Sequence, residues 1–255
     1  MAIQVSLRNK EREYTTILDS SILEGYNDSL ERINSRLRKY LREYGESNNQ
    51  LIGSSSLMNV YLLNSGLISE DARLVTREDL EKVLSIENEF LGKNYVDFGL
   101  ALRIENNDSY KLNGLFIKVL LEDLKKRGIK LGKGKLISLN LLKLKEDEDS
   151  IYGCVFELND KAFKDSIKDL EEYRWDYSRN EGLTRAYLDG DRRWNSYDPR
   201  LDGSNSVGRV VVVSGEATAQ KFLDNYISRL KKENDREIKK IEEEYSKRID
   251  LLKVE

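Results

Sequence analysis

One stretch of the chain, residues 174–209, gathers the side-chain types that most often bind ligands. We call it the Arg/Trp/Tyr segment. It holds both tryptophans, the only proline and seven arginines, and it contains no lysine. Arginine binds carboxylate and phosphate groups through paired hydrogen bonds and stacks on aromatic rings. Tryptophan, tyrosine and arginine are also enriched at binding hot spots, the interface positions that contribute most of the binding energy. Six acidic residues offset the seven arginines, so the segment is not a basic patch.

This composition predicts a recognition surface. Two other interpretations stay open at this stage. Asp–Arg pairs and packed aromatic rings can simply hold a long loop to a sheet, and the same residue types can line a catalytic site. The residues that we expect to bind a partner are Arg174, Trp175, Arg185, Tyr187, Arg192, Arg193, Trp194, Tyr197, Arg200 and Arg209.

The same segment contains three carboxylates, Asp189, Asp191 and Asp198, that are weak candidates for a metal site. Their oxygens suit Mg²⁺ or Ca²⁺, but their spacing matches no EF-hand loop. We therefore predict no metal and no cofactor. A divalent-metal-dependent phosphoryl or nucleotide enzyme, using Asp189, Asp191 and Arg192, is one alternative function.

A second group of candidate residues lies between positions 125 and 135, which we call the basic segment. It contains no acidic residue, and phosphate contacts are one use for such a cluster. The plainer interpretation is that cations are favoured at the C-terminus of a helix. An RNA- or DNA-binding protein is thus a second alternative function. Its candidate residues are Lys125, Lys126, Arg127, Lys130, Lys133 and Lys135.

The composition lowers the expectation of catalysis. The chain has no histidine, which removes the commonest general base and most zinc sites. A single cysteine, Cys154, rules out an intramolecular disulfide and fits a reducing compartment, so we expect a cytoplasmic protein. No apolar run approaches the ~18 residues that cross a membrane. The net charge of −3 offers no global field for nucleic acid.

Two long amphipathic helices are predicted at the ends of the chain. Apolar residues at 23, 26, 30, 33, 37, 40 and 44 alternate in spacing between three and four, which predicts one helix from about residue 19 to Gly45. This helix either packs on its own domain or pairs with another helix. Residues 216–255 repeat with an eleven-residue period and predict a long C-terminal helix. Its partner is either the N-terminal helix or a second copy of the chain.

The middle of the chain predicts the order β-α-β-β-α-β. Before it, Ser54 to Ser56 can cap a short helix. A strand at 96–104, which we expect to be half-buried with Asp97 on its polar side, precedes a helix that starts at Asn113 and stops at Gly128. Strands at 136–145 and 151–158 form a hairpin, Asp160 caps a helix, and four valines at 210–213 form the last strand, which we expect to be buried on both faces. This order predicts an α+β fold, a ferredoxin-like sandwich, with the Arg/Trp/Tyr segment as an insert. The expected regions are a helical N-terminal region at 1–92, the sandwich at 93–215 and the C-terminal helix at 216–255.

These observations lead to one main functional hypothesis. We expect a non-catalytic binding or assembly protein that recognises a protein partner through the Arg/Trp/Tyr segment. The terminal helices would serve for pairing or self-association.

Overall fold

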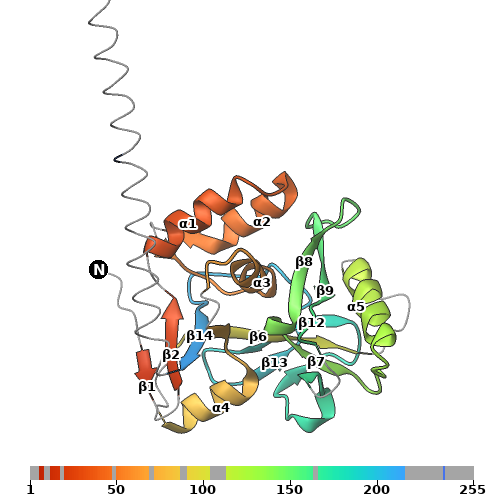
Figure 1. Ribbon diagram of the computed structural model, residues 1–255. Coiled ribbons are helices and arrows are strands. Elements are labelled where there is room, and N and C mark those ends of the chain that lie inside the picture. Colours follow the sequence, from red (N-terminus) through yellow and green to blue (C-terminus); the bar gives the residue numbers. More distant parts are fainter. Residues whose placement is uncertain are drawn as a thin grey trace, which may run out of the picture.

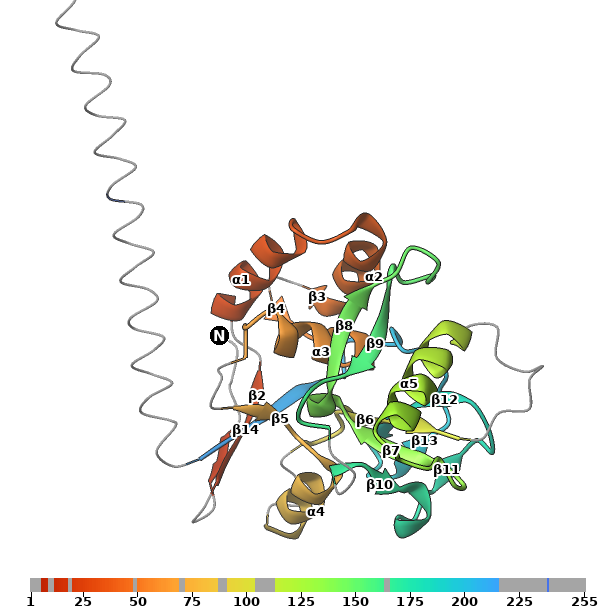
Figure 2. The ribbon, with the colours of Figure 1, turned by 45° about the vertical axis from the view of Figure 1, so that its right-hand side comes forward.

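The computed structural model shows an α+β protein with two main sheets (Figure 1). The residues that it describes are 6–8, 12–17, 20–47, 50–68, 72–86, 91–103, 113–162, 166–215 and 238. The helices α1 and α2 lie at one end of the molecule beside α3, and α4 lies at the opposite end, in both views (Figures 1 and 2). The helices are α1 (Ser20–Leu30), α2 (Ser35–Gly45), α3 (Ser56–Asn64), α4 (Arg77–Ile86) and α5 (Gly114–Lys126).

The larger sheet has six strands in mixed orientation and curves as a half-barrel. Its order is β10 (Lys168–Asp169), β7 (Lys135–Ser138), β6 (Val96–Leu102), β12 (Leu183–Leu188), β13 (Trp194–Ser196) and β11 (Tyr177–Ser178). All neighbouring strands are antiparallel except β13 and β11, which run parallel. The strands β11, β12 and β13 all come from the Arg/Trp/Tyr segment, which therefore supplies half of the sheet.

The smaller sheet has four strands, and two hairpins stand apart from both sheets. The order of the small sheet is β1 (Ser6–Arg8), β2 (Arg12–Ile17), β14 (Val210–Gly215) and β5 (Arg73–Leu74). The hairpins are β3 (Glu46–Ser47) with β4 (Gln50–Leu51), and β8 (Leu142–Glu146) with β9 (Cys154–Leu158).

The predicted α+β class is confirmed, but the ferredoxin-like topology is wrong. The strand expected at 136–145 is broken by a 3₁₀ turn, Leu139–Leu141, so that β7 joins the large sheet and β8 pairs only with β9. Ser138 starts this turn, because its hydroxyl accepts a hydrogen bond from the Asn140 amide. The valine strand is β14, and it lies in the other sheet, between β2 and β5.

Two further elements of the expected sandwich also differ. Where a helix was expected after Asp160, the described residues form the short strand β10 and a 3₁₀ turn, Leu170–Glu172. The Lys135 ammonium binds the Asp169 carboxylate at 2.6 Å, which favours pairing of β10 with β7 over helix formation. The strand expected to be half-buried, β6, is buried along its whole length, because strands lie on both of its edges and apolar clusters cover both of its faces.

The predicted N-terminal helix is two helices. A turn at residues 31–34 separates α1 from α2, and the Asn34 side chain caps α2 by accepting a hydrogen bond from the Leu37 amide at 2.9 Å. Tyr26, Leu30, Leu37 and Leu41 are at most 3% exposed. This part of the apolar seam is therefore covered by the chain's own core. The region also contains the strands β1 to β5, so it is not purely helical.

Two other predicted helix ends agree with the structure. Ser55 caps α3 by accepting a hydrogen bond from the Met58 amide, and α5 ends before Gly128, which has a positive φ of 68°. The predicted C-terminal helix at 216–255 lies outside the described residues, except for Ile238. No helix among the described residues has both the length and the apolar character needed to cross a membrane.

A register shift in the large sheet places the polar residues of its centre. Tyr187 pairs with Asp97 and Ala186 pairs with Gly99, so Phe98 is an extra residue that bulges from β6. Because side chains alternate along a strand, the bulge puts Asp97 on the same face as Arg185 and Tyr187. The opposite face carries Ala186, Leu188 and Trp194 in one apolar cluster with residues of α4 and β14.

Candidate partner-binding site

The centre of the Arg/Trp/Tyr segment is a buried ion pair. The Arg185 guanidinium binds both carboxylate oxygens of Asp97 at 2.7 Å, and it also donates to the Asp198 carboxylate and to the Ser54 carbonyl. The side chains of Arg185 and Asp97 are 5% and 0% exposed. Burial opposes the charge on Arg185, but the neighbouring Asp97 carboxylate outweighs it and raises the arginine pKa. Arg185 is thus a structural residue with no contact surface for a partner.

The loop after β13 closes over this ion pair. The Leu201 carbonyl accepts a hydrogen bond from the Leu57 amide in the first turn of α3, and the Ser204 hydroxyl accepts one from the Ser54 amide. A side chain at Gly203 would meet the Arg185 guanidinium at 2.8 Å, so the loop needs glycine there. Arg209 donates to the carbonyls of its own loop, Ser206 and Gly208. The loop therefore serves the fold.

Both tryptophans surround an arginine of the chain itself. The Arg77 guanidinium, in the first turn of α4, lies 4.3 Å from the ring centre of Trp194, 4.9 Å from that of Trp175 and 4.6 Å from that of Tyr173. Its Nη2 atom donates to the Arg174 carbonyl at 2.8 Å, and the side chain is 4% exposed. We call this arrangement the arginine cage. It fastens α4 to the start of the segment.

The outer edge of the same sheet presents a different surface. Tyr177 and Tyr197 are 48% and 53% exposed. The Arg193 guanidinium lies 5.1 Å from the Tyr177 ring centre and donates to its hydroxyl, and the Arg179 guanidinium lies 4.6 Å from the Tyr197 ring centre. Tyr177 pairs with Asn195, which pairs with Tyr187, so these residues share the face that holds Arg185. We call Tyr177, Arg179, Arg193 and Tyr197 the tyrosine–arginine face.

The remaining predicted residues are scattered around this edge. Arg174, Arg192 and Arg200 are exposed, and Tyr187 is half-buried against Tyr95. Arg192 occupies the left-handed region with φ of 64° at the tip of the β12–β13 hairpin. The structure therefore divides the ten predicted residues into a buried group and an exposed group. Tyr177 and Arg179 were missed by the sequence argument, although their two-residue spacing is the one that places two side chains on the same face of a strand.

The three candidate metal ligands bind arginines and backbone amides. Asp189 accepts hydrogen bonds from the Arg193 amide and side chain and from the Asn195 amide group. Asp191 binds Arg193 at 2.5 Å, and Asp198 binds Arg185 at 3.2 Å. Within the part of the chain that the structure describes, no three acidic or cysteine side chains gather as a metal site requires. Burial raises the pKa of the Cys154 thiol to about 12, so it is not a ready nucleophile.

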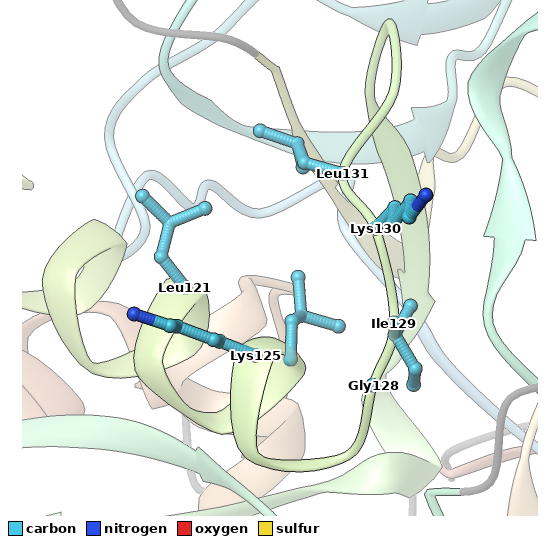
Figure 3. A pocket seen from close by; sticks show the side chains of 7 residues that line it. Leu121, Lys125, Gly128, Ile129, Lys130 and Leu131 are labelled. Carbon is cyan, nitrogen blue, oxygen red and sulfur yellow. The ribbon is translucent and has the colours of Figure 1, made fainter.

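The basic segment begins in the last turn of α5 and borders a shallow pocket of about 410 Å³ (Figure 3). Leu121, Leu124, Ile129 and Leu131 line it, together with Lys125 and Lys130. The other four cations bind groups of the chain itself. Lys126 pairs with Asp123, Lys133 with Glu171 and Lys135 with Asp169, while Arg127 donates to the carbonyls of Leu158 and Ala162.

Comparison of the chain with protein-family models, with curated proteins and with solved structures found no match. The case for a function therefore rests on the geometry above.

Proposed function

We propose that the protein is a non-catalytic binding protein whose tyrosine–arginine face recognises a protein partner. The observation that carries this proposal is the pair of half-exposed tyrosine rings, each with a guanidinium over it, on one side of a sheet edge. Tyrosine and arginine are the residue types that carry most binding energy at protein interfaces. Tyr177 lies on β11, which pairs with β13, and the Arg179 amide donates to the Ser196 carbonyl, so the backbone that carries the face is ordered before binding and less entropy is lost.

The sheet behind this face supports the proposal. The face continues, through Asn195 and Tyr187, from the buried Asp97–Arg185 pair, so the exposed rings stand on a part of the fold with little freedom to move. Sites built on strands are positioned more accurately than sites on loops. We also propose a reducing, cytoplasmic location, which the single and buried cysteine supports.

The alternatives from the sequence stay predictions with less support. Four of the six cations in the basic segment bind groups of the chain itself, so few remain for phosphate. The carboxylates of a metal-dependent enzyme are paired with arginines. Self-association through the terminal helices has less support because the apolar residues of α1 and α2 that pack in the chain's own core are not available to a second helix. The predicted C-terminal helix lies outside the described residues.

Site-specific crosslinking tests the proposal directly. The full chain would carry p-benzoylphenylalanine at position 197, and a matched chain would carry it at position 151, where Ile151 is 44% exposed on the β8–β9 tip. After irradiation in the cell of origin, we expect one protein to be crosslinked from position 197 and not from position 151.

The affinity of that protein, purified, then decides whether tyrosine contacts hold it. Replacement of a hot-spot side chain costs about 2 kcal/mol or more, which is roughly a 30-fold loss of affinity. We expect such a loss for Tyr177→Ala with Tyr197→Ala, and less than a twofold loss for Ile151→Ala. Absence of a crosslink specific to position 197, or an unchanged affinity of the tyrosine variant, would contradict the proposal.

A further inference from the structure

The exposed side of α2 carries a line of cations that comes from no basic run in the sequence. The buried side of this helix carries Leu37 and Leu41. The exposed residues are Arg36, Lys39 and Arg42, with Arg32 in the turn before the helix. Steps of three and four residues place side chains on one side of a helix. We call these four residues the α2 stripe.

Cations outnumber carboxylates along α2 itself. Residues 31–45, from the turn to the end of α2, hold five cations and two acids, Glu31 and Glu43, in a chain whose net charge is −3. Glu31 binds Arg38 at 2.8 Å and Arg42 at 2.5 Å. Arg32 and Lys39 form no ion pair within the described part of the chain.

The stripe is also held in shape. Arg36 donates to the carbonyls of Glu148 and Ser150 at the tip of the β8–β9 hairpin, and Asn34 donates to the Gly153 carbonyl at 3.0 Å. These contacts orient the guanidinium of Arg36 without removing its charge, because carbonyl oxygens carry no formal charge. The helix α2 lies at one end of the molecule (Figures 1 and 2), and the four side chains of the stripe are exposed.

We propose that the α2 stripe binds the phosphate backbone of a nucleic acid duplex. The eleven residues of α2 extend about 16 Å, and a row of cations along a straight, outward-facing helix matches the regular row of charges on a duplex. An α-helix also fits the ~12 Å width of the DNA major groove. Phosphate contacts of this kind position a protein without reading sequence.

The hairpin tip limits this binding. Its acidic residues, Glu146 to Asp149, stand beside Arg36 and repel phosphate. Asp147 is needed for the turn, because its carboxylate accepts hydrogen bonds from the amides of Asp149 and Ser150. Glu148 and Asp149 are exposed, so their charges can be removed without disturbing that turn.

Fluorescence anisotropy with a labelled 24-base-pair DNA duplex, from 50 to 200 mM KCl, tests the inference. The variant Arg32→Gln with Lys39→Gln removes the two unpaired charges of the stripe. Each lost phosphate contact lowers the salt slope by about 0.9, so we expect the slope to fall by about 2 and the affinity by at least tenfold at 50 mM. The matched control, Lys125→Gln with Lys130→Gln, removes the same charge from the basic segment and should change affinity less than twofold.

The tip variant Glu148→Gln with Asp149→Asn should bind the duplex more tightly than the native chain. Equal losses in the stripe and control variants would overturn the inference, because binding would then follow net charge alone. No binding to a DNA or RNA duplex at 50 mM KCl would overturn it as well. Stripe-dependent binding to polyglutamate or anionic vesicles, without binding to either duplex, would assign α2 to another partner.

Discussion

The Arg/Trp/Tyr segment uses the same residue types in two opposite ways. In its buried half, Arg185 binds Asp97 and the two tryptophans enclose Arg77. In its outer half, Tyr177 and Tyr197 lie open to solvent with an arginine over each ring. The difference is set by strand and by face. Arg185 lies on the inner strand β12 and the tryptophans lie on the face that α4 covers, whereas Tyr177 lies on the edge strand β11 and on the other face. An unusual composition therefore does not by itself show whether a segment stabilises the fold or binds a partner.

Replacement of Arg185 should lower the free energy of unfolding most, because it leaves the buried Asp97 carboxylate without a charged partner. Removing one partner of a buried ion pair costs about 3–5 kcal/mol. We expect Arg185→Ala to lower the free energy of unfolding by that amount in urea titrations followed by tryptophan fluorescence. Arg200→Ala, in the exposed half, should change it by less than about 0.5 kcal/mol. Equal losses in the two variants would remove the distinction between the halves.

A second variant separates the effect of the unpaired charge from the effect of lost packing. Replacing both charges, Arg185→Met with Asp97→Leu, avoids the stranded carboxylate, and apolar replacement of a buried pair is often neutral or stabilising. We expect the double variant to be more stable than Arg185→Ala. A double variant that is even less stable would mean that shape, not charge, fixes the centre of the sheet.

The arginine cage should give the next largest effect. A desolvated cation over aromatic rings contributes about 2 kcal/mol, so Arg77→Ala should lower the free energy of unfolding by about that much. Its tryptophan emission should also shift to longer wavelength, because Trp175 and Trp194 lose the side chain between them and α4. Unchanged emission and stability would show that the cage holds nothing in place.

Arg192 should give a smaller effect of opposite sign. A residue other than glycine in the left-handed region carries a cost of about 1 kcal/mol, which Arg192→Gly relieves. We expect a gain in the free energy of unfolding of up to about 1 kcal/mol. Arg192→Ala, which keeps the backbone strain, is the control and should give no gain. A loss in the glycine variant alone would mean that the side chain stabilises the hairpin tip.

The smallest effect on stability should come from the tyrosine–arginine face. An exposed cation–π contact contributes about 0.5–1 kcal/mol, so Tyr197→Ala should lower the free energy of unfolding by about 0.5 kcal/mol in the same urea titration. Partner affinity should fall far more. Phe in place of Tyr197 keeps the ring and should keep most of both. A large loss of stability from Tyr197→Ala would place this ring with the buried half.

The sequence predicted the parts of the fold that depend on local signals. The serine cap within residues 54–56, the end of α5 before Gly128 and the burial of three of the four valines at 210–213 were confirmed. Partner strands in a sheet are chosen by contacts far apart in the chain, so the pairing of β12 with β6 was not accessible. The 3₁₀ break after Ser138 was missed because the apolar pattern LISLNLLKLK continues across it.

The same limit applies to the candidate sites. The sequence pattern predicted that Asp97 faces solvent from a half-buried strand. It gave no sign of the buried partner, Arg185, because that residue lies 88 positions away. The basic segment was visible because its cations are adjacent in sequence, yet most of them bind the chain itself. The cations of the α2 stripe are interspersed with apolar residues, and only the helix brings them onto one side. Adjacency in sequence thus overstated the number of free cations in the basic segment, whereas the wider spacing of the α2 stripe concealed that cluster.

Native-state amide hydrogen exchange tests most directly whether the Arg/Trp/Tyr segment is part of the sheet. Amides of inner strands exchange only when the whole domain unfolds, whereas those of loops and fraying edges exchange through small local openings. We predict that β12 amides are protected to the same free energy as β6 amides, while those of Tyr177 and Ser178 exchange sooner. Rapid exchange across the entire segment, with β6 still protected, would contradict this account and make the segment an appended loop.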